Sequence, residues 1–169
     1  MQGVIIPRNV AVRLHRFTDF FKGFENVAAV KEQFGDRTEQ VLEGLKVEFI
    51  SSRHGYLWID DTDGHIVVSV DYLRNGDERE IYLDIIHELV HVKQLMEGKE
   101  LFENQVEYVE RATEVEAYGY TVKEAKRLGM TDSEILEYLK AEWMDDDEAR
   151  KLARHMGIAS RAVKAEQDE

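Results

Sequence analysis

The chain has 169 residues, which suits one compact domain that buries a real core without disulfides or a structural metal. It contains no cysteine, which excludes a thiolate zinc site, a disulfide framework and a cysteine nucleophile. The formal net charge of -13 at pH 7 would repel phosphate backbones, so we expect no nucleic acid among its partners.

The sequence offers no sign of a membrane segment. No run approaches the about 18 apolar residues that a membrane span needs, and the N-terminus lacks the apolar stretch of a signal peptide. We therefore expect a cytoplasmic protein with no membrane partner. No repeat or low-complexity linker divides the chain, which predicts one domain over residues 1–169 with a frayed tail from about residue 157. No pattern indicates an oligomeric state.

The N-terminal part is predicted to be helical. Apolar residues recur there at helical spacing: Val10, Leu14, Phe17, Phe21 and Phe24. This spacing predicts a first amphipathic helix, followed by a second from about Glu25 to Phe34. A short helix from about Thr38 to Gly44 would come next.

Three runs rich in β-branched and aromatic residues predict strands. They are Lys46 to Ser51, Tyr56 to Asp60, and His65 to Asp71. The separators, 52–55 and 61–64, carry the turn residues of hairpins, so we expect a small three-stranded antiparallel sheet.

The rest of the chain is predicted to be helical, which gives an α+β fold. A strongly apolar helix runs from about Arg79 to Glu97, where Gly98 can cap it, and a long helix follows from about Asn104 to Leu128. Capping boxes predict two further helices, one that starts at Thr131 and extends to about Trp143 and one from Asp145 to about His155.

The apolar helix from about residue 79 to 97 carries a narrow polar stripe. At 100° per residue, Asp84, His87, His91 and Gln94 fall on one face, and Glu88 lies on its flank. Imidazoles four residues apart can reach one Zn²⁺ ion, and Glu88 can accept a proton from a water on that ion. The segment 87–91 thus has the H-E-x-x-H pattern of a zinc hydrolase, with His87 and His91 as metal ligands and Glu88 as general base. The alternative is two core histidines that are satisfied by hydrogen bonds.

Asp84 allows two interpretations. It lies three residues before His87 and could orient the non-ligating ring nitrogen, or it could be an exposed acid near the start of the helix.

A catalytic zinc ion needs a third protein ligand, which must be His, Asp or Glu in a chain without cysteine. The helix from about 104 to 128 offers Glu110, Glu114 and Glu116 beside small residues that allow close helix packing. Glu114 and Glu116 lie about 200° apart on a helix, so only one of them can face the metal. Periodicity leaves the choice open.

Together, the segment from His87 to His91 and the later run Glu114-Val115-Glu116-Ala117 resemble the gluzincin clan of zinc metallopeptidases, and the short chain resembles the minigluzincins most. The resemblance covers residues 80 to 122. It implies a zincin-like domain and places the third ligand at Glu114, with Ala117 as the small residue of the family pattern. Several members carry Asp or Asn four residues after this ligand, where the present chain has Tyr118.

The resemblance implies a zinc-dependent metallopeptidase that binds one catalytic Zn²⁺ ion and cleaves a peptide or protein substrate. Zinc would activate a water and Glu88 would act as the base; the strand from His65 to Asp71 would pair with an extended substrate. Four residues are available as an oxyanion stabiliser, although each is more readily explained as a packing or surface residue: Tyr108, Tyr118, Tyr120 and His155.

Two further expectations concern the rest of the sequence. The remaining histidines, at positions 15, 54 and 65, are interpreted as ordinary surface or turn residues. By analogy with small gluzincins, the acidic segment from Met144 could cover the cleft. The alternative function is a zinc-binding scaffold or regulator with little or no proteolytic turnover.

Overall fold

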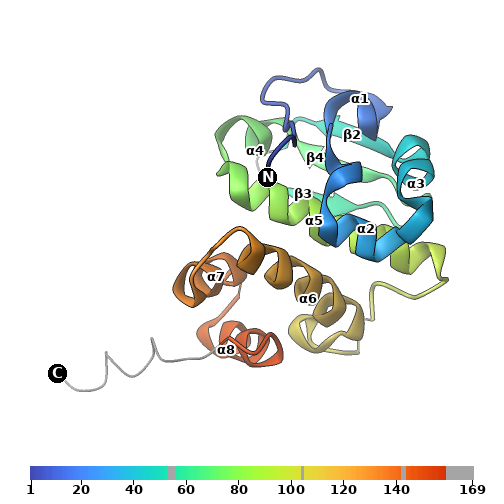
Figure 1. Cartoon of the computed structure of the whole chain (residues 1–169). Coiled ribbons are helices and arrows are strands. Elements are labelled where there is room, and N and C mark those ends of the chain that lie inside the picture. Colours follow the sequence, from blue (N-terminus) through green and yellow to red (C-terminus); the bar gives the residue numbers. More distant parts are fainter. Residues whose placement is uncertain (53–55, 104, 142–143, 159–169) are drawn as a thin grey trace. The chain divides into compact units, whose positions relative to one another are not determined.

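The computed structural model describes residues 1–52, 56–103, 105–141 and 144–158 (Figure 1). The chain forms two compact units, Met1–Leu101 and Phe102–Glu169. The fold class is α+β, as the sequence predicts. Within the described ranges, no helix combines the length and the apolar character that crossing a bilayer requires.

The first unit contains the sheet and most of the helices. Its strands are β1 (Leu14–Arg16), β2 (Lys46–Ile50), β3 (Leu57–Ile59) and β4 (Ile66–Ser69). Its helices are α1 (Phe17–Phe20), α2 (Ala28–Phe34), α3 (Thr38–Gly44), α4 (Val70–Asn75) and α5 (Glu78–Met96), with 3-10 turns η1 (Phe24–Asn26) and η2 (Gly35–Arg37).

The sheet differs from the predicted antiparallel meander. It has four strands in the order β1-β2-β4-β3 (Figure 1), and β2 and β4 are parallel, with Val47 opposite Ile66 and Phe49 opposite Val68. The pairs β1-β2 and β3-β4 are antiparallel. Local turn residues correctly predicted the β3-β4 hairpin. Turn residues could not show that β4 lies between β2 and β3, so that β3 does not pair with β2.

The predicted first helix is wrong in its N-terminal half. Residues 14–16 form the edge strand β1 instead, and Leu14 is exposed. The helical spacing arose from Phe17 in α1, Phe21 just after it and Phe24 in η1, whose buried rings pack against one another. The sequence spacing of these core aromatic residues therefore matched that of one long amphipathic helix, although they do not lie on one. The short helix from Thr38 to Gly44 is confirmed.

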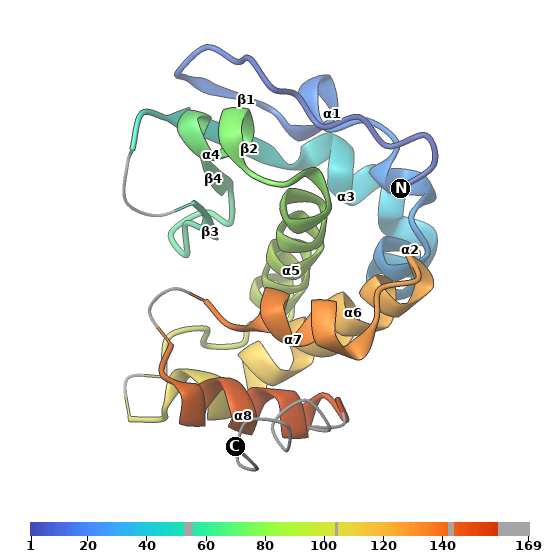
Figure 2. The same ribbon diagram turned by 90° about the vertical axis from the view of Figure 1, so that its left-hand side faces the viewer.

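The third predicted strand is shorter than expected. Figure 2 shows α4 directly after β4, because Ser69 caps a new helix through a hydrogen bond that its hydroxyl accepts from the Tyr72 N–H. Every residue of β4 is buried. β4 pairs with β2 on one side and β3 on the other, so its main chain is not free to bind an extended substrate. The assignment of a substrate to residues 65–71 is therefore wrong.

The second unit is helical in its described residues. It contains η3 (Tyr108–Glu110), α6 (Ala112–Arg127), α7 (Asp132–Leu139) and α8 (Asp146–His155). The helix predicted from residue 104 begins only at Ala112, because the extended backbone of Arg111 separates it from η3. Both predicted capping boxes, Thr131 with Glu134 and Asp145 with Glu148, are present.

Two predictions concern residues beyond the described ranges. The helix predicted to run from Thr131 to about Trp143 ends earlier, at Leu139, and Trp143 itself lies outside the described residues. The tail from residue 159 onward also lies outside them. Ile158 is buried, and its N–H donates a hydrogen bond to the Ala153 carbonyl, so the described chain remains packed up to that residue.

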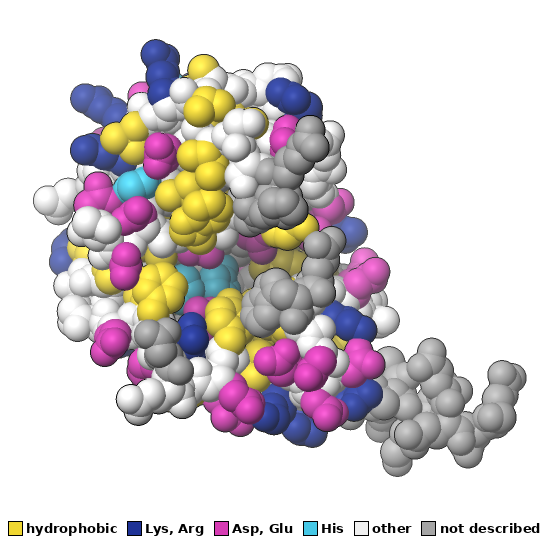
Figure 3. Space-filling view, turned by 180° about the vertical axis from the view of Figure 1, so that it is seen from behind, with side chains coloured by type: hydrophobic (Ala, Val, Ile, Leu, Met, Phe, Trp, Pro, Cys, Tyr) yellow, Lys and Arg dark blue, Asp and Glu magenta, His cyan; other side chains and the backbone are white. Residues whose placement is uncertain are grey.

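Figure 3 shows acidic side chains spread over the face that it draws, with basic side chains among them.

Candidate metal centre

The helix that carries the H-E-x-x-H segment forms as the sequence predicts. α5 begins after Asp77, whose carboxylate accepts hydrogen bonds from the N–H groups of Arg79 and Glu80 at 2.8 and 3.2 Å. It ends before Gly98, whose φ of 76° lets the Lys99 N–H reach the Gln94 carbonyl at 2.9 Å. The helix contacts β3 and α2, and its central residues are buried.

Four polar side chains are buried on α5: His87, Glu88, His91 and Gln94. The Nε2 atoms of His87 and His91 lie 3.0 Å apart, and the two rings are nearly perpendicular, at 79°. A carboxylate oxygen of Glu88 lies within 4.8 Å of one ring nitrogen of each histidine. The structure therefore brings together the three residues that the motif singled out.

Gln94 fixes the tautomer of one histidine. Its side-chain oxygen, Oε1, accepts a hydrogen bond of 2.8 Å from Nδ1 of His91. From this pattern we assign the proton of a neutral His91 ring to Nδ1, which leaves a lone pair on Nε2. That lone pair faces Nε2 of His87. Sequence analysis placed Gln94 on the polar stripe but gave it no role; its position three residues after His91 was the available signal.

The donor set fits a zinc ion. Two imidazole nitrogens that bind one tetrahedral zinc at about 2.0 to 2.1 Å are separated by about 3.3 Å. The observed separation of 3.0 Å differs from this value by less than side-chain rotation can adjust. Both imidazoles and the carboxylate are buried, where a bound cation would offset the desolvation of these polar groups.

Asp84 is hydrogen-bonded to a residue of the first unit. Its carboxylate accepts a hydrogen bond of 2.5 Å from the Tyr72 hydroxyl of α4. Burial, together with the charge of Asp84, raises the pKa of Tyr72 well above its usual value, so this hydroxyl keeps its proton. Orientation of His87 by Asp84 stays a prediction.

The three candidate third ligands differ in their surroundings. Glu114 is buried on α6, whereas Glu116 is half-buried. Glu110 is exposed in η3, with its carboxylate 3.7 Å from the ammonium of Lys151. All three belong to the second unit, while His87 and His91 belong to the first. The assignment of Glu114 as third ligand stays a prediction.

The tyrosines around Glu114 form a cluster in the second unit. The hydroxyls of Tyr108 and Tyr118 lie 3.4 Å apart, and Tyr108 hydrogen-bonds to Glu114. Burial raises the pKa of Tyr108, and the neighbouring Tyr118 and Glu114 raise it further. Tyr108 therefore stays protonated and donates to the carboxylate. Tyr120 is half-buried on α6, and His155 is exposed at the end of α8.

Of the other three histidines, the structure describes His15 and His65, and both contact neighbouring side chains. His15 packs against the rings of Phe20 and Phe49, and His54 lies outside the described residues. His65 lies between two carboxylates: Nδ1 hydrogen-bonds to Asp63, and Nε2 is 3.3 Å from Glu48. With Asp60 it makes a second group of potential ligands, but both of its ring nitrogens already face carboxylates.

We compared the chain with protein-family models, with curated proteins and with solved structures, and none of the three comparisons gives a match.

Proposed function

We propose that the protein is a zinc-dependent metallopeptidase with its catalytic centre on α5. The observation that carries the proposal is the pair of buried Nε2 atoms of His87 and His91, 3.0 Å apart, with the lone pair of His91 directed toward its neighbour by Gln94. Glu88 lies beside them on the same helix. A zinc ion held by the two histidines supplies Lewis-acid polarisation of water and of a carbonyl group.

The chain's own residues have distinct roles in this proposal. His87 and His91 hold the ion, and Gln94 keeps the His91 ring in the ligating tautomer. Glu88 takes a proton from the attacking water and returns it to the leaving amine, so that it is charged again at the end of the cycle. Glu114 is the proposed third ligand, on the strength of the family resemblance and of its burial.

The edge strand is the better candidate for holding a substrate. β3 (Leu57–Ile59) pairs with β4 on one side only among the described strands, and it contacts α5. A peptide that adds to this edge would be bound through its main chain, which gives little sequence selectivity. The proposal therefore predicts activity on extended or unfolded polypeptides.

Metal content and turnover test the proposal together. We expect stoichiometric zinc in the purified chain and its loss in His87→Ala. Glu88→Gln should keep the metal and lower kcat/KM on a peptide library by about 10²- to 10⁴-fold, since it removes only the base. Glu78→Gln, which changes an exposed glutamate in the first turn of the same helix, is the matched control and should keep full activity.

Other outcomes would overturn the proposal. A chain that neither contains nor binds zinc would exclude a zinc enzyme. Zinc without turnover in the wild-type chain would favour the alternative of a zinc-binding scaffold. Equal activity in the wild type and Glu88→Gln would refute the role of Glu88.

A further inference from the structure

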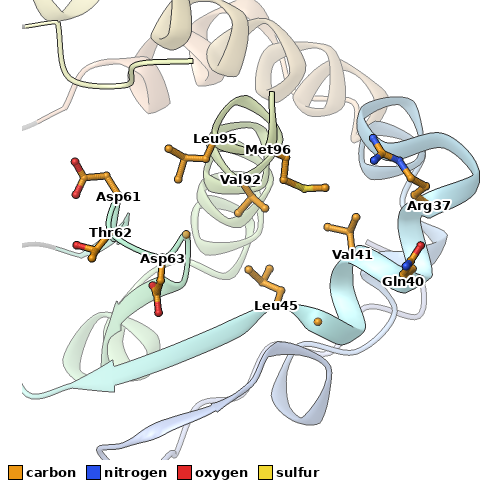
Figure 4. A pocket seen from close by; sticks show the side chains of 12 residues that line it. Arg37, Gln40, Val41, Leu45, Asp61, Thr62, Asp63, Val92, Leu95 and Met96 are labelled. Carbon is orange, nitrogen blue, oxygen red and sulfur yellow. The ribbon is translucent and has the colours of Figure 1, made fainter. Parts of the chain in front are cut away.

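A pocket in the first unit lies near the C-terminal end of α5. Its volume is about 580 Å³, which is within the usual range of small-ligand sites. Figure 4 shows it lined by side chains of α5, of the α2-α3 region, and of the turn between β3 and β4. All of its lining residues belong to the first unit.

The floor of this pocket is aliphatic. It is formed by Val41, Leu45, Val92, Leu95 and Met96. Met96 is the last residue of α5 and is 51% exposed. Methionine is common at surfaces that accept apolar side chains of varied shape. The floor therefore favours aliphatic groups as its occupant.

Charges of opposite sign flank the floor. Figure 4 shows Asp61 in the β3-β4 turn on one side and Arg37 on the other, with the aliphatic side chains between them. Among the residues that the structure describes, no ion pair or hydrogen bond engages the side chain of either residue. Both charges are thus available to a ligand.

The lining excludes several other ligand classes. It holds no aromatic ring in its described residues, so a sugar or a nucleobase has nothing on which to stack. A single arginine opposed by Asp61 and Asp63 is a poor site for a phosphate group. A fatty acid would match Arg37 but would leave the acidic side without a partner.

We propose that this pocket binds a short peptide with aliphatic side chains. Its amino-terminal or side-chain ammonium would meet Asp61, its carboxylate would meet Arg37, and its aliphatic groups would cover the floor. A sphere of this volume is about 10 Å across, which about three extended residues span. The site is separate from the histidine pair, and its binding does not require a metal.

Gly44 allows the pocket to be partly filled by a single substitution, which tests the proposal. It lines the pocket at the end of α3, its φ is not in the left-handed region, and a Cβ added there meets no atom within 4 Å. A leucine at this position would therefore fill part of the pocket without straining the backbone. Glu43→Leu adds the same side chain to the neighbouring, exposed position outside the pocket and serves as its control.

The experiment titrates the full chain, treated with a chelator, with the tripeptide Lys-Leu-Leu and follows binding by calorimetry and amide NMR shifts. We expect saturable binding with shifts at the pocket residues, at least about ten-fold weaker in Gly44→Leu and unchanged in Glu43→Leu. Arg37→Gln and Asp61→Asn should each weaken binding about two- to five-fold, since both charges are exposed.

Three results would overturn the proposal: no saturable binding, equal binding by Gly44→Leu, or equal binding of Gly-Gly-Gly, which has the same termini without aliphatic side chains. Because the titration is made without metal and measures no turnover, its failure leaves the proposed peptidase centre untouched. Conversely, loss of zinc or of turnover in the variants of His87 and Glu88 would not affect this test.

Discussion

In the proposed zinc centre, single side chains on α5 would set the affinity for the ion. Gln94 is fully buried, and its side-chain oxygen accepts a hydrogen bond from Nδ1 of His91. We expect Gln94→Leu to lower zinc affinity about 10- to 100-fold, as loss of a residue that orients a ligating histidine does. Competition with a chromophoric chelator measures this.

Two variants control for packing. Gln94→Glu offers an acceptor to the same ring nitrogen and should keep most of the affinity. Gln33→Leu removes another buried glutamine, which donates to the Ile86 carbonyl of α5 at 3.4 Å and does not contact the histidines through any described bond. Equal losses from Gln94→Leu and Gln33→Leu would show that packing, rather than orientation, carries the effect.

His65 gives the molecule a pH-dependent contact. Burial lowers its pKa, but the hydrogen bonds and charges of Asp63 and Glu48, with a smaller effect of Asp60, outweigh burial and raise the pKa overall. Its folded-state pKa thus lies above the unfolded value of about 6.5. The stabilisation is fully present below that value and is lost as the pH rises through the folded-state pKa.

We therefore expect the stability difference between wild type and His65→Gln to be larger at about pH 5.5 than at about pH 8.5, where the contribution is lost. Urea unfolding at both values measures the difference, and NMR titration of the ring gives the pKa directly. Glu48→Gln should lower that pKa. A ring pKa below the unfolded value would contradict the prediction.

At the scale of elements, the start of α5 depends on one cap. The Asp77 carboxylate accepts hydrogen bonds from two N–H groups of the first turn. Asp77→Ala should lower the free energy of unfolding by about 0.5 to 2 kcal/mol, the usual cost of losing an N-cap. Glu78→Ala, which removes a neighbouring exposed acid that is not the cap, should cost less. Thermal unfolding of the two variants compares them, and equal losses would refute the capping role.

At the scale of the whole molecule, the proposal assigns the third zinc ligand to Glu114. We expect Glu114→Gln to lower zinc affinity more than the about 10- to 100-fold expected for Gln94→Leu, because it removes a ligand rather than an orienting group. Glu116→Gln and Glu110→Gln are matched charge controls on the same stretch of chain and should leave the affinity unchanged. If either control variant loses zinc affinity while Glu114→Gln keeps it, the third ligand is the residue changed in that control and not Glu114.

Local signals predicted much of the secondary structure. Caps and periodicity gave α3, α5 and α8 nearly to their ends, and the start of α7 but not its end, because these features depend on hydrogen bonds and side-chain contacts within a few residues. The same reasoning failed for residues 14–16, which form a strand only because β2 lies beside them. It also missed α4 and the late start of α6.

The sequence by itself determined the helix, the spacing of His87, Glu88 and His91, and hence that their side chains share a surface, since these follow from the geometry of one helix. Only the tertiary structure decided how α5 is buried, that Gln94 fixes the His91 tautomer, and that β4 is an inner strand while β3 is an edge strand. It also formed the pocket between α5, α3 and the β3-β4 turn. Burial, strand order and cavities depend on contacts between residues far apart in the chain, and no local pattern encodes these contacts.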